Sequence, residues 1–267
     1  MTDHRPSSAF RELHHRAGAF IIPNPWDVGS AKILAAMGFE ALATTSAGFA
    51  HSRGQKDGGV TWAEMLENCR DIVAATPLPV SGDLEKGIGD TPESAAETIR
   101  QAASIGLAGA SLEDFSGDRS QPIFDFTLAA ERIAAACEAA RELGQDFVVT
   151  ARSENFLHGR PDLGDTIKRL QAFEAAGADV LYAPGIRGLD QIRAVCSAVS
   201  KPVNVLAGGS LGLADLEAAG AKRLSVGSGL ARAAYGGFIQ AAKEMREHGT
   251  FTFARNATSF AEIEGYF

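Results

Sequence analysis

Acidic residues follow two similar runs of the sequence, and they are the residues best suited to carry chemistry. Asp83 and Glu85 come at the end of the short apolar run that begins at 79–80, and Glu113 closes the run 109–112. On a strand, Asp83 and Glu85 would leave the same face because they are two residues apart. Carboxylates gathered where adjacent strands end repel each other unless a cation or a proton holds them together. The pattern therefore indicates a divalent metal bound by Asp83, Glu85 and Glu113.

Eight strand-like runs alternate with helix-like segments and would position these acids. The strands are expected at 19–22, 41–44, 80–83, 108–112, 147–151, 180–183, 203–206 and 223–226. A Gly-rich loop is expected at 47–59, and helices at 6–17, 28–37, 62–75, 92–104, 128–143, 165–176, 189–199, 213–219 and 230–248. Eight strand–helix units in about 250 residues are typical of a (β/α)8 barrel. A doubly wound open sheet is the alternative, but no Gly-x-Gly-x-x-Gly follows the first strand.

No linker or shift in composition divides the chain. Residues 1–267 are therefore expected to form a single (β/α)8 barrel domain with a short N-terminal helix and an apolar C-terminal tail. The tail contains Phe251, Phe253, Phe260 and Phe267. Burying one such ring is worth about 1.5–3 kcal/mol, so these rings should leave water. They would pack either on their own barrel or on a neighbouring subunit; we favour the neighbour and expect a homo-oligomer.

Composition excludes several classes of partner. The net charge of −8 argues against nucleic acid or an anionic membrane. No run of about 18 apolar residues is present, and the start, MTDHRPSSAF, lacks the apolar stretch of a signal peptide, so we expect a cytoplasmic protein. The three cysteines have no motif spacing, which favours reduced core thiols over a disulfide frame or a zinc site.

The carboxyl ends of the strands supply the remaining candidates, because active sites of such barrels lie there. They are Asn24, Asp27, Ser46, Ala47, Gly48, Asp83, Glu85, Glu113, Asp114, Arg152, Tyr182, Asn204 and Ser228. This set offers no Lys for a Schiff base and no Cys or Ser/His pair for nucleophilic attack. Mg²⁺ takes one or two carboxylates plus substrate oxygens, and a guanidinium pairs bidentately with a carboxylate. We therefore expect a small anionic 2-oxo acid as substrate, contacted by Arg152 and Asn204.

Five motifs occur in an order that resembles the isocitrate lyase/phosphoenolpyruvate mutase superfamily. They are Pro-Asn-Pro-Trp-Asp at 23–27, Ala-Thr-Thr-Ser-Ala-Gly at 43–48, Asp-Leu-Glu-Lys-Gly-Ile-Gly at 83–89, Ser-Leu-Glu-Asp at 111–114 and Thr-Ala-Arg at 150–152. The match spans roughly residues 18–230 in consistent order and is more specific than any single motif. It is strongest to the short bacterial members often called phosphoenolpyruvate-mutase-like proteins.

The resemblance implies a fold, a metal and roles for individual residues. The fold is a (β/α)8 barrel whose last helix is swapped between subunits, usually in a tetramer built as a dimer of dimers. The metal is Mg²⁺, with Mn²⁺ as the alternative, held largely through water by the acids matching Asp83, Glu85 and Glu113. The substrate carboxylate is held by Arg152 and by backbone N–H groups around 46–48, the positions of Ser46, Ala47 and Gly48. Asp57 matches a catalytic acid that contacts the metal's water shell or the reacting group.

The loop after the fourth strand departs from the lyases of that superfamily. Isocitrate and methylisocitrate lyases carry a Cys there as general acid, whereas residues 115–122 contain neither Cys nor His, nor the Asn of phosphonopyruvate-forming mutases. The remaining function is a Mg²⁺-dependent lyase or decarboxylase acting on a small 2-oxo (di)carboxylic acid through a metal-stabilised pyruvate-type enolate. The alternatives are a phosphonopyruvate hydrolase or phosphonomutase-type enzyme that acts on a P–C bond, and a carboxylate-binding barrel without turnover.

Several of these residues also have structural interpretations. Arg152 is followed by Glu154, so a structural salt bridge is an alternative to substrate binding. Ser46 and Gly48 could serve close packing at the barrel rim, and Asp57 could belong to an ordinary turn. His158 is expected in a surface loop, and His14 is expected to face solvent.

Overall fold

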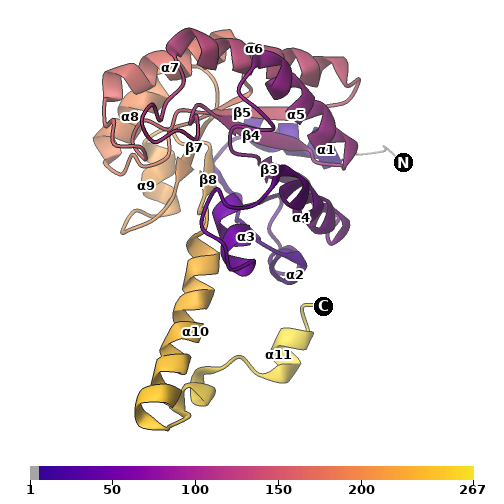
Figure 1. The fold of residues 1–267 in the computed structure, drawn as a ribbon, viewed down its shortest axis with the longest axis vertical. Helices are drawn as coiled ribbons and strands as arrows, with labels where there is room; N and C mark the ends of the chain where they lie inside the picture. The colour runs from indigo at the N-terminus through magenta and orange to yellow at the C-terminus, as the bar shows by residue number, and fades with distance from the viewer. Residues whose placement is uncertain (1–5) are drawn as a thin grey trace.

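Eight parallel strands form one curled sheet in the computed structural model, which describes residues 6–267. The strands are β1 Phe20–Ile21, β2 Leu42–Ala43, β3 Val80–Asp83, β4 Gly109–Glu113, β5 Val148–Arg152, β6 Val180–Tyr182, β7 Val203–Leu206 and β8 Arg223–Ser225. Their spatial order is β1-β8-β7-β6-β5-β4-β3-β2. The two ends of this order meet where the N–H of Ala43 donates to the carbonyl of Pro23 at 3.1 Å. The predicted (β/α)8 barrel is confirmed (Figure 1).

Helices follow the strands as the sequence pattern predicts, mostly within two residues of the expected bounds. They are α1 Pro6–His15, α2 Val28–Ala36, α3 Ser46–Ser52, α4 Trp62–Ala74, α5 Pro92–Ser104, α6 Phe126–Glu142, α7 Leu163–Ala175, α8 Leu189–Ala198, α9 Leu213–Ala218, α10 Gly229–His248 and α11 Phe260–Glu264, with a 3-10 turn η1 at Thr252–Asn256. Side-chain caps start several of them: Asp27 accepts the N–H of Ser30 in a capping box, and Thr91 accepts the N–H of Ser94.

The short helix α3 corrects the expectation of a Gly-rich loop at 47–59. Thr45 begins it, because its hydroxyl accepts the N–H of Gly48 at 3.2 Å. Ser46, Gly48 and Ala50 are buried on its inner side, so tertiary packing stabilises a turn of helix that the local glycine content disfavours.

The closed end of the barrel is sealed by α1. Phe10 and Leu13 of this helix pack with Phe20, Ile22, Ala41, Ala108, Val148 and Val180 in one cluster of buried residues. His14 lies among them with 5% exposure, so the expectation that it faces solvent was wrong. The rings of Phe10 and Phe20 contact it edge-on, and its Nδ1 bonds to the carbonyl of Phe10 at 2.8 Å, which satisfies one polar atom of the buried ring.

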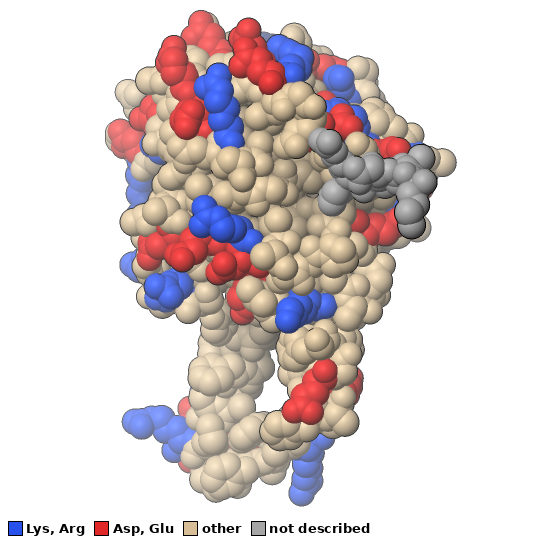
Figure 2. Space-filling view, turned by 90° about the vertical axis from the view of Figure 1, so that its right-hand side faces the viewer, with Lys and Arg blue, Asp and Glu red and all other residues tan. Residues whose placement is uncertain are grey.

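Helix α10 extends away from the barrel, and η1 and α11 continue this C-terminal arm (Figures 1 and 2). Of the twenty residues of α10 only Ala231 is buried. Phe238, Phe251, Phe260 and Phe267 are 69%, 66%, 84% and 64% exposed. Packing of the tail on a neighbouring subunit stays a prediction. Within residues 6–267, no helix is both long and apolar enough to span a membrane.

Candidate active site

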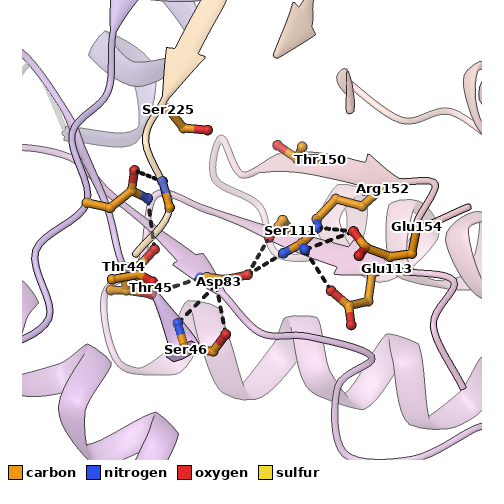
Figure 3. Close-up of polar contacts among 12 residues, drawn as sticks. Thr44, Thr45, Ser46, Asp83, Ser111, Glu113, Thr150, Arg152, Glu154 and Ser225 are labelled. Atoms are coloured by element: carbon orange, nitrogen blue, oxygen red, sulfur yellow. Dashed lines mark hydrogen bonds and ion pairs between the residues drawn. The ribbon is translucent and has the colours of Figure 1, made fainter. Parts of the chain in front are cut away.

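Asp83, the last residue of β3, is the centre of a network of polar contacts at the carboxyl end of the barrel (Figure 3). Its Oδ2 accepts the N–H and the hydroxyl of Ser46, each at 3.0 Å. Its Oδ1 accepts Nη1 of Arg152 at 2.5 Å and the hydroxyl of Ser111 at 3.4 Å. Its own N–H donates to the hydroxyl of Thr44 at 2.8 Å. These bonds join β2, β3, β4 and β5 at one point.

Arg152, the last residue of β5, contacts three carboxylates. Nη1 reaches Asp83, while Nη2 lies 3.0 Å from Glu113 and 2.8 Å from Glu154. The side chain is 13% exposed, and its guanidinium carbon lies 5.3 Å from the ring centroid of Tyr182. Burial alone would lower the pKa of Arg152, but Glu154, Glu113 and Asp83 together raise it well above its ordinary value. Arg152 therefore forms the structural salt bridge to Glu154, and it also contacts Asp83 and Glu113, two of the predicted metal ligands.

Arg152 carries one positive charge but contacts three carboxylates. Burial raises the pKa of Glu113 well above its ordinary value, and Glu154 and Asp83 raise it further against the opposing effect of Arg152. Burial would also raise the pKa of Glu154, but Arg152 and His158 lower it below its ordinary value. The cluster therefore keeps an excess of negative potential that one guanidinium does not cancel.

Glu85 and Asp57 add to this negative potential from two loops. Glu85 has a left-handed backbone (φ 50°), the one positive φ at a non-glycine residue in the described chain. Burial, followed by repulsion from Asp83 and Asp57, raises its pKa to about 7. Burial and then Asp83 raise the pKa of Asp57 as well. Such raised values indicate acids that gain from a nearby cation.

A cavity of about 170 Å³ opens between these strand ends. Its walls include predicted site residues from seven strands or their loops: Asn24, Ser46, Ala47, Asp57, Asp83, Arg152, Tyr182, Asn204 and Ser228. Gly48, Glu85, Glu113 and Asp114 are not among its lining residues. The lining also includes Arg223, so two guanidinium groups and two carboxylates lie on the wall of a space that suits a molecule of a few heavy atoms.

Close packing explains why residue 48 is a glycine. A Cβ at this position would lie 2.6 Å from Cγ2 of Thr45 and 3.2 Å from the Cβ atoms of Trp26 and Ala231. Its N–H donates to Thr45, and the N–H of Ser46 donates to Asp83, so both groups have partners within the protein. The packing interpretation therefore holds for Gly48, while Ser46 serves to orient Asp83.

Two further strand-end residues serve the framework. Oδ1 of Asn24 accepts the N–H groups of Val226 and Gly227 at 2.8 and 2.9 Å, and its Nδ2 donates to the carbonyl of Thr44 at 3.1 Å. Asn24 thereby ties the loop after β1 to β2 and β8. Asp27 caps α2 as expected.

Asp114 supports the cluster from outside the cavity. Oδ1 of Asp114 accepts the N–H of Glu154 at 2.7 Å, and its Oδ2 accepts Nη1 of Arg169 at 3.2 Å. Burial raises the pKa of Asp114 to about 6. Its contact with the chain beside Arg152 makes it a positioning residue.

The loops after β4 and β5 meet through two aromatic rings. The rings of Phe115 and His158 are stacked, with centroids 3.8 Å apart and planes inclined by 8°. Nε2 of His158 lies 3.6 Å from Glu154, which itself pairs with Arg152. His158 lies in a loop, as expected from the sequence, and it is a half-buried part of this junction.

Comparison with known proteins identifies the family of this site. The family model described as phosphoenolpyruvate phosphomutase matches residues 10–246. The chain belongs to the isocitrate lyase/phosphoenolpyruvate mutase superfamily. This superfamily includes lyases, oxaloacetate decarboxylase, phosphonopyruvate hydrolase and phosphonomutase.

Three similar proteins illustrate the range of the superfamily. A solved structure of a candidate lyase/mutase from Burkholderia cenocepacia J2315 is 57% identical, covers 98% of this chain and 95% of its own, and superposes with a TM-score of 0.96. An uncharacterized protein of Mycobacterium tuberculosis is 34% identical over 82% of both chains. The structure of oxaloacetate acetylhydrolase in complex with the product oxalate is 26% identical, covers 98% and 94%, and has a TM-score of 0.87.

Superfamily members use Mg²⁺, and the residues of this chain fit a hydrated ion. Among residues 7–267, no three His, Cys, Asp or Glu side chains are placed to coordinate one ion directly. Mg²⁺ keeps several waters and takes one or two direct carboxylates, so it does not need such a cage. Burial, together with repulsion from neighbouring carboxylates, raises the pKa values of Glu85 and Glu113, and a nearby dication would favour their ionised forms. Asp83, Glu85 and Glu113 are the residues that would hold it.

Sequence reasoning missed the polar residues deeper in the barrel of this superfamily member. Ser111 bonds to Asp83, Thr150 and Arg223 bond to each other, and Ser225 bonds to Asn204. Each of these four residues lies on a strand and points to the same face as residues two positions away. The alternation of side chains along a strand could have identified two of them, because Ser111 lies two residues before Glu113 and Thr150 lies two residues before Arg152.

Proposed function

We propose that the protein is a Mg²⁺-dependent carbon–carbon lyase that decarboxylates a small 2-oxo dicarboxylic acid such as oxaloacetate. The observation that carries this proposal is the position of Arg152, which lies between Asp83, Glu113 and Glu154 on the wall of a cavity of about 170 Å³. A guanidinium recognises a carboxylate, and the surrounding acids suit the dication that a 2-oxo acid chelates.

Arg152 binds and orients the substrate in this proposal. Its planar fork can exchange the single oxygen Oδ1 of Asp83 for the carboxylate of the substrate, which can accept from the fork bidentately. Oδ1 of Asp83 would then be available to hold the cation, while Ser46 keeps Oδ2 in place. The ring of Tyr182, 5.3 Å from the guanidinium carbon, limits the directions in which Arg152 can swing.

Decarboxylation is compatible with the residues of the loop after β4, which offers no Cys or His as general acid. The bond between the departing carboxylate and the adjacent carbon breaks, CO₂ leaves, and the electron pair moves onto the 2-oxo group to give an enolate, which later takes a proton at carbon. No acid is needed on the departing fragment, and residues 114–125 contain neither Cys nor His. Mg²⁺, when bound, stabilises the negative charge that develops on the 2-oxo oxygen.

Asp57 is the residue placed to hold the proton that the enolate takes. It lines the cavity, and its pKa is raised by burial and by Asp83. A carboxylic acid with a raised pKa donates a proton at a pH where an ordinary carboxyl is already ionised. Relatives named oxaloacetate decarboxylase and oxaloacetate acetylhydrolase support a four-carbon 2-oxo dicarboxylate as the substrate class.

Turnover assays with and without EDTA test the proposal. The purified protein is incubated with oxaloacetate or phosphonopyruvate, and pyruvate and phosphate are measured. Pyruvate formed from oxaloacetate only with Mg²⁺ is the expected result, and Asp83→Asn should reduce kcat at least about 100-fold because it removes a charge at the reacting centre. Asp146→Asn is the matched control, since Asp146 pairs with Arg11 at the opposite end of the barrel.

The other outcomes separate the alternatives. Release of phosphate from phosphonopyruvate, without pyruvate from oxaloacetate, would assign the site to P–C bond hydrolysis. Oxalate binding with no product from either compound would make the barrel a carboxylate-binding protein.

A further inference from the structure

Arg223 is a buried cation at the floor of the cavity. It lies on β8, is 4% exposed and lines the same space as Asp83 and Arg152. Its guanidinium crosses the barrel interior and donates from Nη2 to the hydroxyl of Thr150 on β5 at 3.0 Å. Below it lies His14 of α1, the helix that seals the closed end of the barrel. Arg223 therefore separates that seal from the cavity.

Among the residues that the structure describes, every polar partner of Arg223 is neutral. Its Nε donates to the amide oxygen of Asn204 at 2.9 Å, and its Nη1 lies 3.4 Å from Nε2 of His14. Burial, followed by the charge of Arg223, lowers the pKa of His14 to about 3, so the imidazole is uncharged at neutral pH. Because a carbonyl can only accept, Nδ1 of His14 carries the proton bonded to Phe10, and Nε2 is free to accept from Arg223.

The charge of Arg223 has no counter-charge within the described residues. No carboxylate of residues 7–267 lies within 4.0 Å of its guanidinium. Burial lowers its pKa to about 10, which still leaves it protonated at neutral pH. Buried charges are normally paired, because desolvation of an isolated ion is costly. The other guanidinium on the cavity wall, that of Arg152, is already shared by three carboxylates.

We propose that Arg223 is the charge that recognises the anionic ligand from the cavity floor, and that it opposes the acid cluster in setting the balance between anion and cation binding. This inference rests on the proposed function, in which a 2-oxo dicarboxylate and Mg²⁺ share the cavity. A fixed cation beneath the ligand stabilises a dianion more than a monoanion, and it weakens the attraction of the nearby acids for Mg²⁺. Removing the charge of Arg223 should therefore lower the affinity for the anionic ligand and raise the affinity for Mg²⁺.

Calorimetric titration of Arg223→Met tests this inference with Mg²⁺ alone and with oxalate at saturating Mg²⁺. We expect oxalate affinity to fall about tenfold and Mg²⁺ affinity to rise severalfold, as expected for loss of one nearby charge. Pyruvate, a monoanion, should lose less affinity than oxalate. Arg223→Lys retains the charge and should keep oxalate affinity within about threefold of the wild type.

The control and the alternative outcomes make the test specific. Arg193→Met removes an exposed guanidinium that pairs with Asp190 on α8, and both affinities should stay unchanged. A role in sealing the barrel alone would lower both affinities of Arg223→Met together or leave both unchanged, and either result overturns the inference. Circular dichroism checks folding, and Arg223→Gln replaces Arg223→Met if the latter does not fold. Failure of the proposed function is seen separately, as a wild-type protein that binds oxalate without Mg²⁺-dependent turnover.

Discussion

The guanidinium of Arg152 links two carboxylates from neighbouring strands, with Nη1 2.5 Å from Asp83 and Nη2 3.0 Å from Glu113. Both acids are residues that would hold a dication, so the guanidinium and the ion compete for the same oxygens. We infer that arrival of the ion releases Arg152 toward the cavity, where it becomes available to a substrate carboxylate. Under this inference, cation binding and substrate binding would be coupled through this one side chain.

Replacement of Arg152 tests this competition through stability. Arg152→Met leaves Asp83, Glu113 and Glu154 without their shared partner, and breaking a buried ion pair costs about 3–5 kcal/mol of unfolding free energy. The loss should be largest in EDTA at alkaline pH and smaller with Mg²⁺, which supplies the missing charge. Urea unfolding with and without Mg²⁺ measures it, and Arg193→Met is the exposed control. An equal loss with and without Mg²⁺ would contradict the competition.

Glu85 predicts a pH dependence for the metal-free protein. Its folded pKa is about 7, raised from an ordinary value of 4.5, so between these values the folded state holds a proton that the unfolded state has lost. The stability that this provides is complete below the unfolded pKa and is lost as the pH rises through about 7. Glu85→Gln removes the titration and should flatten the decline of stability between about pH 5 and 8 in EDTA.

Urea midpoints across that pH range measure the effect of Glu85→Gln. Glu138→Gln, at an exposed position of α6, is the matched control and should reproduce the wild-type slope. If Glu85→Gln also kept the wild-type slope, the raised pKa of Glu85 would not describe the protein in solution.

Local signals explain why much of the fold was predictable. The run that ends in Asp83 gave β3 with its observed bounds, and Thr91 with Pro92 marked the start of α5. The helix α3 was missed because Thr45 caps it and tertiary contacts bury Gly48, and neither effect appears in the local glycine content. Long-range packing also decided the burial of His14.

The site was predictable to the extent that it follows from strand ends. Asp83 and Arg152 were selected because both end apolar runs, and the barrel then brings them together across 69 residues of sequence. The environment of Arg223 could not be predicted from strand ends, because its contact with His14 joins residues 209 positions apart in the sequence. Whether a buried charge is compensated depends on such distant partners, which no local pattern contains.

The stacked rings of Phe115 and His158 predict that the loop after β4 is held closed. An aromatic pair contributes about 0.5–1.5 kcal/mol, so Phe115→Ala should raise the open population of the loop about two- to tenfold. Limited trypsin digestion at the exposed Arg119 measures this population when reclosing is faster than cleavage. His158→Gln should give a similar increase, and Phe238→Ala, in the distant arm, should give none. Unchanged cleavage in both loop variants would show that the stack does not restrain the loop.

The exposed phenylalanines of the C-terminal arm predict self-association. Phe238 and Phe260 are 69% and 84% exposed, and apolar surface removed from water contributes about 25 cal/mol per Å². The wild type should therefore have a multiple of the single-chain mass in light scattering, and Phe238→Asp or Phe260→Asp should shift it toward the single chain. Met37→Asp, at a 59% exposed position after α2, carries the same new charge and should leave the mass unchanged. A wild-type protein that is monomeric at micromolar concentration would instead show that the arm stays unpartnered.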